Sequence, residues 1–225
     1  MGFAEELRRA AAPIWEAILE HPYLKELASG TLPRETFRFY VQQDWLYLQE
    51  FTRTAALTAA RCPDVKEMRL LLTWAEPLVT MESHFHHSHA AELGLDFDNI
   101  SWQMNETNWA YTRHMLASAY GGSSVEALAA LMPCPIVYAH CGAVLAEAQP
   151  TDPLYAEWIN FYAMNLRRGT NSRGERIELI EGLIDRLAEQ AKPEELERAK
   201  WNYLVSSRYE WLFWDAAYRQ YDWPV

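Results

Sequence analysis

The stretch Leu131-Met-Pro-Cys-Pro-Ile-Val-Tyr138 places Cys134 between two prolines. After Pro135 the sequence has helical character and stays apolar as far as Val144. Proline suits the first helical position, because its missing N–H would be unpaired there anyway. We therefore expect Cys134 at the N-cap of a helix or just before it. Unpaired N–H groups and the helix dipole at such a position lower the pKa of a thiol and favour the nucleophilic thiolate.

The alternative interpretation of this stretch is a buried structural cysteine at the start of a helix, because free cysteine is among the most buried residue types. The other two cysteines, Cys62 and Cys141, form no C-x-x-C pair and no zinc-ligand spacing. Three cysteines without a paired framework are typical of a reducing compartment, so we expect a cytoplasmic protein.

Outward from this stretch, nearly every segment repeats its apolar residues with helical spacing. No alternating strand pattern, glycine-rich linker or internal repeat interrupts the series. We predict a single all-α domain over residues 1–225, built from nine or ten helices with short connections. The expected helices cover 3–19, 23–28, a segment capped by Thr31 that runs to 52, a following helix to 61, 65–93, 106–120, a segment from 127 to 132 that leads into the cysteine stretch and the helix ending at about 149, 153–166, 175–190 and 193–218.

The composition excludes some classes of function. A net charge of -11 opposes binding to nucleic acid and to anionic membranes, because phosphates require clustered Lys and Arg. The N-terminus lacks the basic and apolar regions of a signal peptide. We expect no apolar run long enough to span a membrane. The polar segment from Arg167 to Gly174 is expected to form a turn.

Asp44 and Tyr47 are three residues apart in a predicted helix and therefore share a face. Their neighbours include Tyr40, Leu48 and Phe51, so this face is largely apolar. An aspartate is rarely buried there without a partner, which makes Asp44 a candidate functional residue. The alternative is an aspartate on the helix surface.

Glu210 is the second candidate carboxylate and lies in the last predicted helix, where Tyr203, Ser207 and Trp214 share its helical face. A carboxyl group in apolar surroundings has a raised pKa, which suits a proton donor near neutral pH. The alternative is a solvated glutamate, or one that is ion-paired with Arg208 or Arg219.

Two further tyrosines and one histidine-rich segment are candidates of lower specificity. Tyr111 and Tyr162 are tyrosines within aromatic helices, and each could equally be a core residue with its hydroxyl at the surface. Glu82, His86 and His89 share one helical face and suggest a metal site. A di-iron site needs a second Glu-x-x-His helix, which the sequence lacks. We therefore expect packing or an ion pair there, and no metal.

Taken together, these segments resemble the TenA family of thiaminase II, or aminopyrimidine aminohydrolase, proteins over almost the whole chain. The resemblance rests on Tyr111, Tyr162 and three motifs. The motifs are Asp44-Trp-Leu-Tyr47, Pro133-Cys-Pro-Ile-Val-Tyr138 and Ser206-Ser-Arg-Tyr-Glu-Trp-Leu-Phe-Trp214. The family fold is that of haem oxygenase, an all-α bundle.

The resemblance implies hydrolysis of a 4-amino-2-methylpyrimidine at the substituted methylene on C5, without a cofactor. Cys134 would be the nucleophile and Glu210 would exchange a proton with a ring nitrogen. Asp44 would hold the exocyclic amine, and Tyr47 would pack on the ring. The remaining substrate-binding residues would be Tyr111, Tyr138 and Tyr162.

The expected partners are a small aminopyrimidine or thiamin, and further copies of the chain in a homotetramer. Neither nucleic acid nor a membrane is an expected partner. Two other hypotheses remain open at this point. One is a protein of the same fold that binds a pyrimidine without turnover, and the other is a metal-dependent oxidase of a related helical bundle.

Overall fold

Helices dominate the computed structural model, which describes residues 2–167 and 173–225, without the side chains of 77–79, 81–82, 164–167 and 173–176. The described part of the chain contains no strand, so the predicted all-α class is confirmed. The helices are α1 (Phe3–Leu19), α2 (Pro22–Ser29), α3 (Arg34–Arg61), α4 (Val65–Leu93), α5 (Glu106–Gly121), α6 (Ser124–Leu131), α7 (Pro133–Leu145), α8 (Pro153–Arg167), α9 (Arg173–Ala188) and α10 (Pro193–Arg219).

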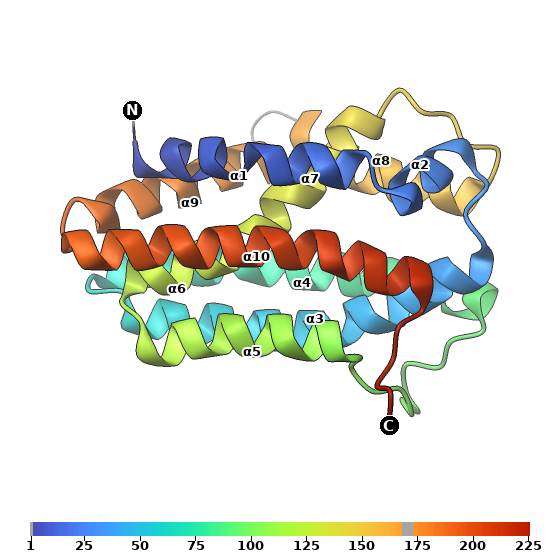
Figure 1. Ribbon diagram of the computed structural model, residues 1–225, viewed down its shortest axis with the longest axis horizontal. Helices are drawn as coiled ribbons and strands as arrows, with labels where there is room; N and C mark the ends of the chain where they lie inside the picture. Colours follow the sequence, from blue (N-terminus) through green and yellow to red (C-terminus); the bar gives the residue numbers. More distant parts are fainter. Residues whose placement is uncertain (1, 168–172) are drawn as a thin grey trace.

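The last helix, α10, runs through the length of the bundle (Figure 1). It contacts α1, α2, α3, α5, α6 and α7. Helix α3 packs between α4 and α5, and α7 packs mainly against α8. Polar residues on α10 therefore face several helices at once, and Glu210 is one of them.

Local signals determine the ends of several helices as predicted. Both α1 and α4 have the predicted bounds. The side chain of Asp64 accepts the backbone N–H of Lys66 and caps the start of α4. Gly30 and Gly94 adopt left-handed φ values of 77° and 63° directly after α2 and α4, a conformation that glycine adopts without steric cost.

Helix α3 corrects two expectations. It is one continuous helix of 28 residues, without a break after Thr52, and Pro33 rather than Thr31 occupies its N-cap. No glycine or proline interrupts it after Arg34. The hydroxyls of Thr54 and Thr58 bond to the backbone carbonyls four residues earlier, so these residues stay within the helix instead of ending it.

The start of α7 corrects the predicted position of Cys134. Pro133, not Pro135, is the first helical residue, so Cys134 lies inside the first turn. Met132 separates α6 from α7 and itself has helical angles, φ -70° and ψ -27°. Figure 1 shows α7 leaving at an angle to α6. Both prolines fit a first turn because neither needs an N–H partner there, so the sequence alone did not fix which one begins the helix.

The same segment corrects the expectation about apolar length. Ser124–Leu145 has a mean hydropathy of 1.7 over an 18-residue window and is long enough, by length and composition, to cross a membrane. In this structure 72% of that window is buried inside the protein. Its hydropathy is thus accounted for by packing against neighbouring helices.

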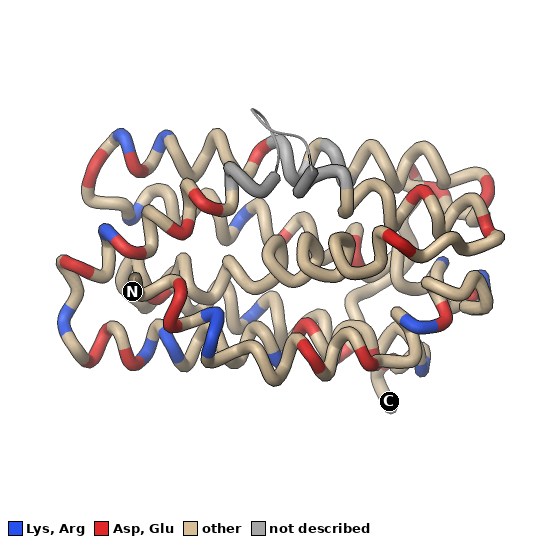
Figure 2. Tube along the Cα trace, turned by 90° about the horizontal axis from the view of Figure 1, so that it is seen from above, with Lys and Arg blue, Asp and Glu red and all other residues tan. Residues whose placement is uncertain are grey.

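The acidic residues behind the net charge are spread along the bundle (Figure 2). The interior is strongly aromatic, with Tyr23, Tyr40, Trp158 and Trp214 among its largest fully buried side chains.

Candidate active site

Residues from five helices form the candidate site. All are buried except Cys134, which is half-buried. They are Asp44 and Tyr47 on α3, Tyr111 on α5, Cys134 and Tyr138 on α7, Tyr162 on α8, and Glu210 on α10. Contacts and electrostatic interactions link them to one another, as the following paragraphs describe. Helices far apart in the sequence thus bring the predicted residues together.

The hydroxyl of Tyr111 donates a hydrogen bond to Oε1 of Glu210 at 2.5 Å, and both side chains are buried. The alternative of a solvated Glu210 at the protein surface is therefore wrong. The two arginines considered as its partners are engaged elsewhere. Arg219 pairs with Asp215 at 2.8 Å, and Arg208 lies over the ring of Trp201. Glu210 is thus held by a phenol inside the protein.

Cys134 lies within electrostatic reach of two tyrosines. Burial raises the pKa of Tyr47 well above its ordinary value, and the negative charges of Cys134 and Glu210 raise it further. Burial also raises the pKa of Tyr111, as do the charges of Glu210 and Cys134. Both phenols therefore stay protonated at neutral pH and can donate hydrogen bonds. The thiol and the carboxyl group thus share the same two phenols as neighbours.

The other cysteines have environments that suppress the thiolate. Burial raises the pKa of Cys62 to about 11. The Cys62 Sγ donates to the backbone carbonyl of Thr58. Cys141 is fully buried, and burial raises the pKa of its thiol as well. Because the thiolate is the nucleophile, Cys134 is the strongest candidate among the three cysteines.

Asp44 is buried in the core, so the alternative of a surface aspartate is wrong. Its Oδ2 lies 3.0 Å from Nε2 of His86 on α4. Burial raises the pKa of Tyr138, and the charges of Tyr40 and Asp44 add to the shift. Asp44 thus lies close to the α7 side of the site.

Two groups of aromatic rings lie among the site residues. The Tyr138 ring centroid is 4.9 Å from that of Tyr162 and 5.1 Å from that of Trp214. On the other side, the centroid of Tyr47 lies 5.2 Å from that of Tyr111 and 5.7 Å from that of Phe213. Such walls exclude water and offer flat surfaces to a planar ligand.

Gly142 allows α7 and α8 to approach closely beside the site. A Cβ atom at this position would lie 2.6 Å from the backbone carbonyl carbon of Tyr162, closer than real Cβ contacts allow. The absent side chain thus sets the spacing between Tyr138 on α7 and Tyr162 on α8.

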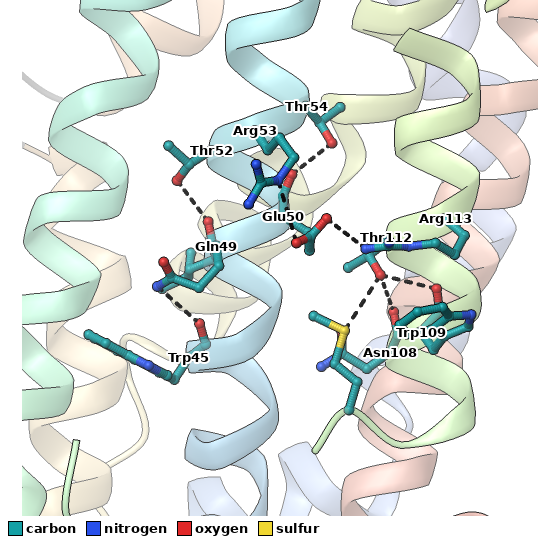
Figure 3. A network of polar contacts seen from close by, with 12 residues as sticks. Trp45, Gln49, Glu50, Thr52, Arg53, Thr54, Asn108, Trp109, Thr112 and Arg113 are labelled. Atoms are coloured by element: carbon teal, nitrogen blue, oxygen red, sulfur yellow. Dashed lines mark hydrogen bonds and ion pairs between the residues drawn. The ribbon is translucent and has the colours of Figure 1, made fainter. Parts of the chain in front are cut away.

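Polar contacts on either side of the Tyr47–Tyr111 pair hold α3 against α5. Figure 3 shows one of them, in which Arg113 donates to Oε2 of Glu50 at 2.6 Å. The other is the Asn108 amide, which donates to the backbone carbonyl of Gln43 at 2.8 Å. These contacts fix the register in which Tyr47 meets Tyr111.

The two buried histidines of the histidine-rich segment in α4 contact carboxylates of other residues. His86 contacts Asp44, and His89 lies 3.3 Å from Glu157 and 3.6 Å from Glu92. The side chain of Glu82 lies outside the described residues. Among those that are described, no group of three or more His, Cys, Asp or Glu side chains could hold a metal ion.

Sequence reasoning missed the pairing of His86 with Asp44. Spacing within one helix reports which residues share a face, but not which residue of another helix they meet. The sequence favoured packing or an ion pair for the histidines of this segment, but it did not identify Asp44 as the partner of His86.

The arrangement joins a half-buried thiol, a buried carboxyl group bonded to a phenol, and a second carboxylate, all among aromatic rings. A thiol with a nearby proton donor can form and release a covalent adduct with an electron-poor ring. The second carboxylate can accept hydrogen bonds from an amine.

Comparison with known proteins gives three findings. A model of the TENA/THI-4/PQQC family matches residues 8–220. The aminopyrimidine aminohydrolase of Bacillus subtilis (strain 168) is 33% identical over 224 residues, which cover 99% of this chain and 92% of that protein. The solved structure of a TenA homologue from P. horikoshii OT3 superposes with a TM-score of 0.85 at 31% identity, covering 97% of this chain and 99% of that one.

A domain with a heme oxygenase-like fold from Shewanella denitrificans OS217 supports the fold alone. It superposes with a TM-score of 0.73 at 16% identity, over 96% of this chain and 92% of that one. The expected haem-oxygenase-like bundle is therefore confirmed.

Proposed function

The chain belongs to the TENA/THI-4/PQQC family, and we propose that it is an aminopyrimidine aminohydrolase, the activity also called thiaminase II. Its substrates are 4-amino-2-methylpyrimidines that carry an amine, or the thiazolium of thiamin, on the methylene at C5. Hydrolysis yields the hydroxymethylpyrimidine, which is a product for thiamin salvage. The names of relatives such as the Bacillus subtilis protein support this assignment.

One structural observation carries the proposal. The thiol of Cys134 and the carboxyl group of Glu210 lie around the same two phenols, Tyr47 and Tyr111. A nucleophile and a proton donor are thus close enough to act on one planar ring. A protein that only binds a pyrimidine needs neither group, so this pairing favours catalysis over simple binding.

The first step joins the thiolate of Cys134 to the unsubstituted ring carbon beside C5. The electron pair of the broken ring π-bond moves to a ring nitrogen, which takes a proton from Glu210. The electron-rich adduct then expels the substituent from the C5 methylene, where the protonated ammonium form leaves as the neutral amine, and the ring nitrogen returns its proton to Glu210. Covalent addition in this way replaces one high barrier with several lower ones.

The second half of the reaction reverses the addition. Water adds to the exposed methylene and passes a proton to the released amine, while the ring nitrogen is protonated again by Glu210. The ring then expels the Cys134 thiolate and gives the nitrogen-bound proton back to Glu210. The net change is one water consumed, one amine released and both catalytic groups restored.

The other residues orient the ring. Asp44 accepts hydrogen bonds from the 4-amino group, and Tyr47 packs on the ring face. Tyr111, Tyr138 and Tyr162 hold the ring and the catalytic groups by hydrogen bonds or contact. Their burial favours this role, because phenols that stay protonated remain donors throughout the reaction.

The working form is a cytoplasmic homotetramer that needs no cofactor and binds neither nucleic acid nor a membrane. Exposed tryptophans support an assembled form. Trp109, Trp201 and Trp223 are 48%, 60% and 47% exposed in the single chain. Aromatic residues of this size are enriched where subunits meet.

Product analysis tests the proposed function. Purified protein is incubated with 4-amino-5-aminomethyl-2-methylpyrimidine and, separately, with thiamin in ¹⁸O-water. We expect the hydroxymethylpyrimidine with one ¹⁸O atom, detected by mass spectrometry, from at least the aminomethyl compound. Quenching of tryptophan fluorescence by the compounds without any product would instead establish a binding protein and contradict the proposal.

A further inference from the structure

His86 on α4 is the residue that meets the buried carboxylate of Asp44 on α3. These two helices pack side by side (Figure 1). The His86 Nε2 nitrogen lies 3.0 Å from Asp44 Oδ2, and both side chains are buried. A carboxylate is costly to bury without a partner, so His86 offsets part of that cost.

The protonation of the pair follows from its surroundings. Two unprotonated acceptors at 3.0 Å would repel each other, so a proton must lie on the contact. Nδ1 of His86 is buried and has no hydrogen-bond partner among the described residues. A protonated Nδ1 would therefore be a buried donor without an acceptor, which is unfavourable. A proton on Nε2, with Nδ1 left unprotonated, satisfies both constraints.

The imidazole is held rigidly by aromatic neighbours. Its ring centroid lies 6.2 Å from that of Phe97, with an angle of 19° between the two ring planes. The centroid of the Trp45 ring lies 6.1 Å from it in an edge-to-face arrangement. A ring fixed in this way can orient the carboxylate it contacts. The contact between His86 Nε2 and Asp44 Oδ2 is short but is not aligned as a full hydrogen bond, and the buried Asp44 Oδ2 makes no aligned hydrogen bond elsewhere in the described part of the chain. It therefore has capacity for a donor from a ligand.

We propose that His86 is a positioning residue, which holds Asp44 in the orientation that accepts the 4-amino group of the substrate. This inference rests on the proposed function. His86 does not touch the reacting atoms, and it acts only through Asp44. Without the imidazole, the carboxylate can rotate, and the site loses its preference for an amino group at C4.

The test compares His86→Leu with His86→Gln. The amide nitrogen of glutamine can occupy the place of Nε2 and donate, whereas leucine cannot. His89→Leu is the matched control, because His89 is also buried and contacts carboxylates, Glu92 and Glu157, outside the site. Each variant is titrated by tryptophan fluorescence with 4-amino-5-hydroxymethyl-2-methylpyrimidine and with its analogue that has hydrogen at C4. KM and kcat are measured with the aminomethyl substrate.

We expect His86→Leu to weaken binding of the 4-amino compound by about 10- to 100-fold, the range for a lost charge-assisted contact. Binding of the C4-hydrogen analogue should stay unchanged. KM should rise more than kcat falls. His86→Gln should restore affinity for the 4-amino compound to within a few-fold of the wild type, and His89→Leu should behave as the wild type.

Equal weakening of both compounds in His86→Leu would show a general packing effect and overturn the proposal. Failure of a folded His86→Gln variant to regain the preference for the 4-amino group would also overturn it. Turnover by the unmodified protein tests the proposed function separately. A wild type that hydrolyses the substrate, together with a His86→Leu variant that keeps full preference for the amino group, would refute only the role of His86.

Discussion

The Tyr111 hydroxyl donates to Glu210 Oε1 at 2.5 Å, between two helices that are 99 residues apart in the chain at this contact. Because the phenol stays protonated, it can donate to Glu210 whether or not the carboxyl group itself carries a proton. Glu210 can therefore give and take a proton without losing its position. This property is what the proposed mechanism requires of it.

Glu210→Gln should separate proton transfer from binding. Glutamine keeps the size of the side chain and can still accept from Tyr111, but it cannot supply a proton to the ring. We expect kcat to fall by about 10²- to 10⁴-fold, the usual effect of losing a general acid, while ligand affinity changes little. Steady-state kinetics beside fluorescence titration measure the two effects. Loss of affinity with unchanged turnover per bound ligand would make Glu210 only a binding residue.

Asp44→Asn should have the opposite profile. The amide replaces one acceptor oxygen with a donor that faces the donor of the substrate's amino group. We expect binding to weaken by about 1–3 kcal/mol, because a buried polar group is left unpaired. Isothermal titration calorimetry with the hydroxymethylpyrimidine measures this loss. An affinity equal to that of the wild type would remove Asp44 from the binding site.

Thiol labelling should distinguish the three cysteines. A pKa of about 11 leaves Cys62 as thiolate in roughly one molecule in a thousand at pH 8, and burial raises the pKa of Cys141 as well. A raised thiol pKa means that reactivity appears only as the pH rises toward that value. In the native protein at pH 8 we therefore expect iodoacetamide to modify Cys134 first, with bound pyrimidine slowing the reaction.

Peptide mapping by mass spectrometry identifies the modified cysteine, and unfolded protein is the control in which all three should react. Labelling of Cys62 ahead of Cys134 would be the opposite of what the structure implies.

Oligomeric state can be measured directly. Multi-angle light scattering at micromolar concentration should give four times the mass of the 26.1 kDa chain. The reason is the exposure of large aromatic side chains, Trp109, Trp201 and Trp223, on the isolated chain. A single species with the mass of one chain would contradict the tetramer.

The parts of the fold that depend on local chemistry could be predicted from the sequence. The bounds of α1 and α4 follow from apolar periodicity, the Asp64 cap and the turn at Gly94. The break expected within α3 was wrong because threonine hydroxyls bonded to their own helix leave it intact. Local patterns predict the presence of helices well. They predict poorly where one helix ends and the next begins.

The candidate site was predictable as a set of residues but not as an arrangement. Cys134 and Glu210 stand in motifs that identify them, whereas the contact of His86 with Asp44 depends on the register between α3 and α4. The position of Cys134 within the first turn depended on whether Pro133 or Pro135 begins α7. Such details are set by tertiary packing, for which one sequence carries no direct signal.

The most direct test of the central claim is the turnover number of Cys134→Ser with the aminomethylpyrimidine, compared with Cys62→Ser as the control. Serine is a far weaker nucleophile without an adjacent base, so kcat should fall by much more than tenfold while ligand affinity is kept. Cys62→Ser should match the wild type. A fall of less than tenfold in Cys134→Ser, about 1.4 kcal/mol in activation free energy, would exclude Cys134 as the nucleophile.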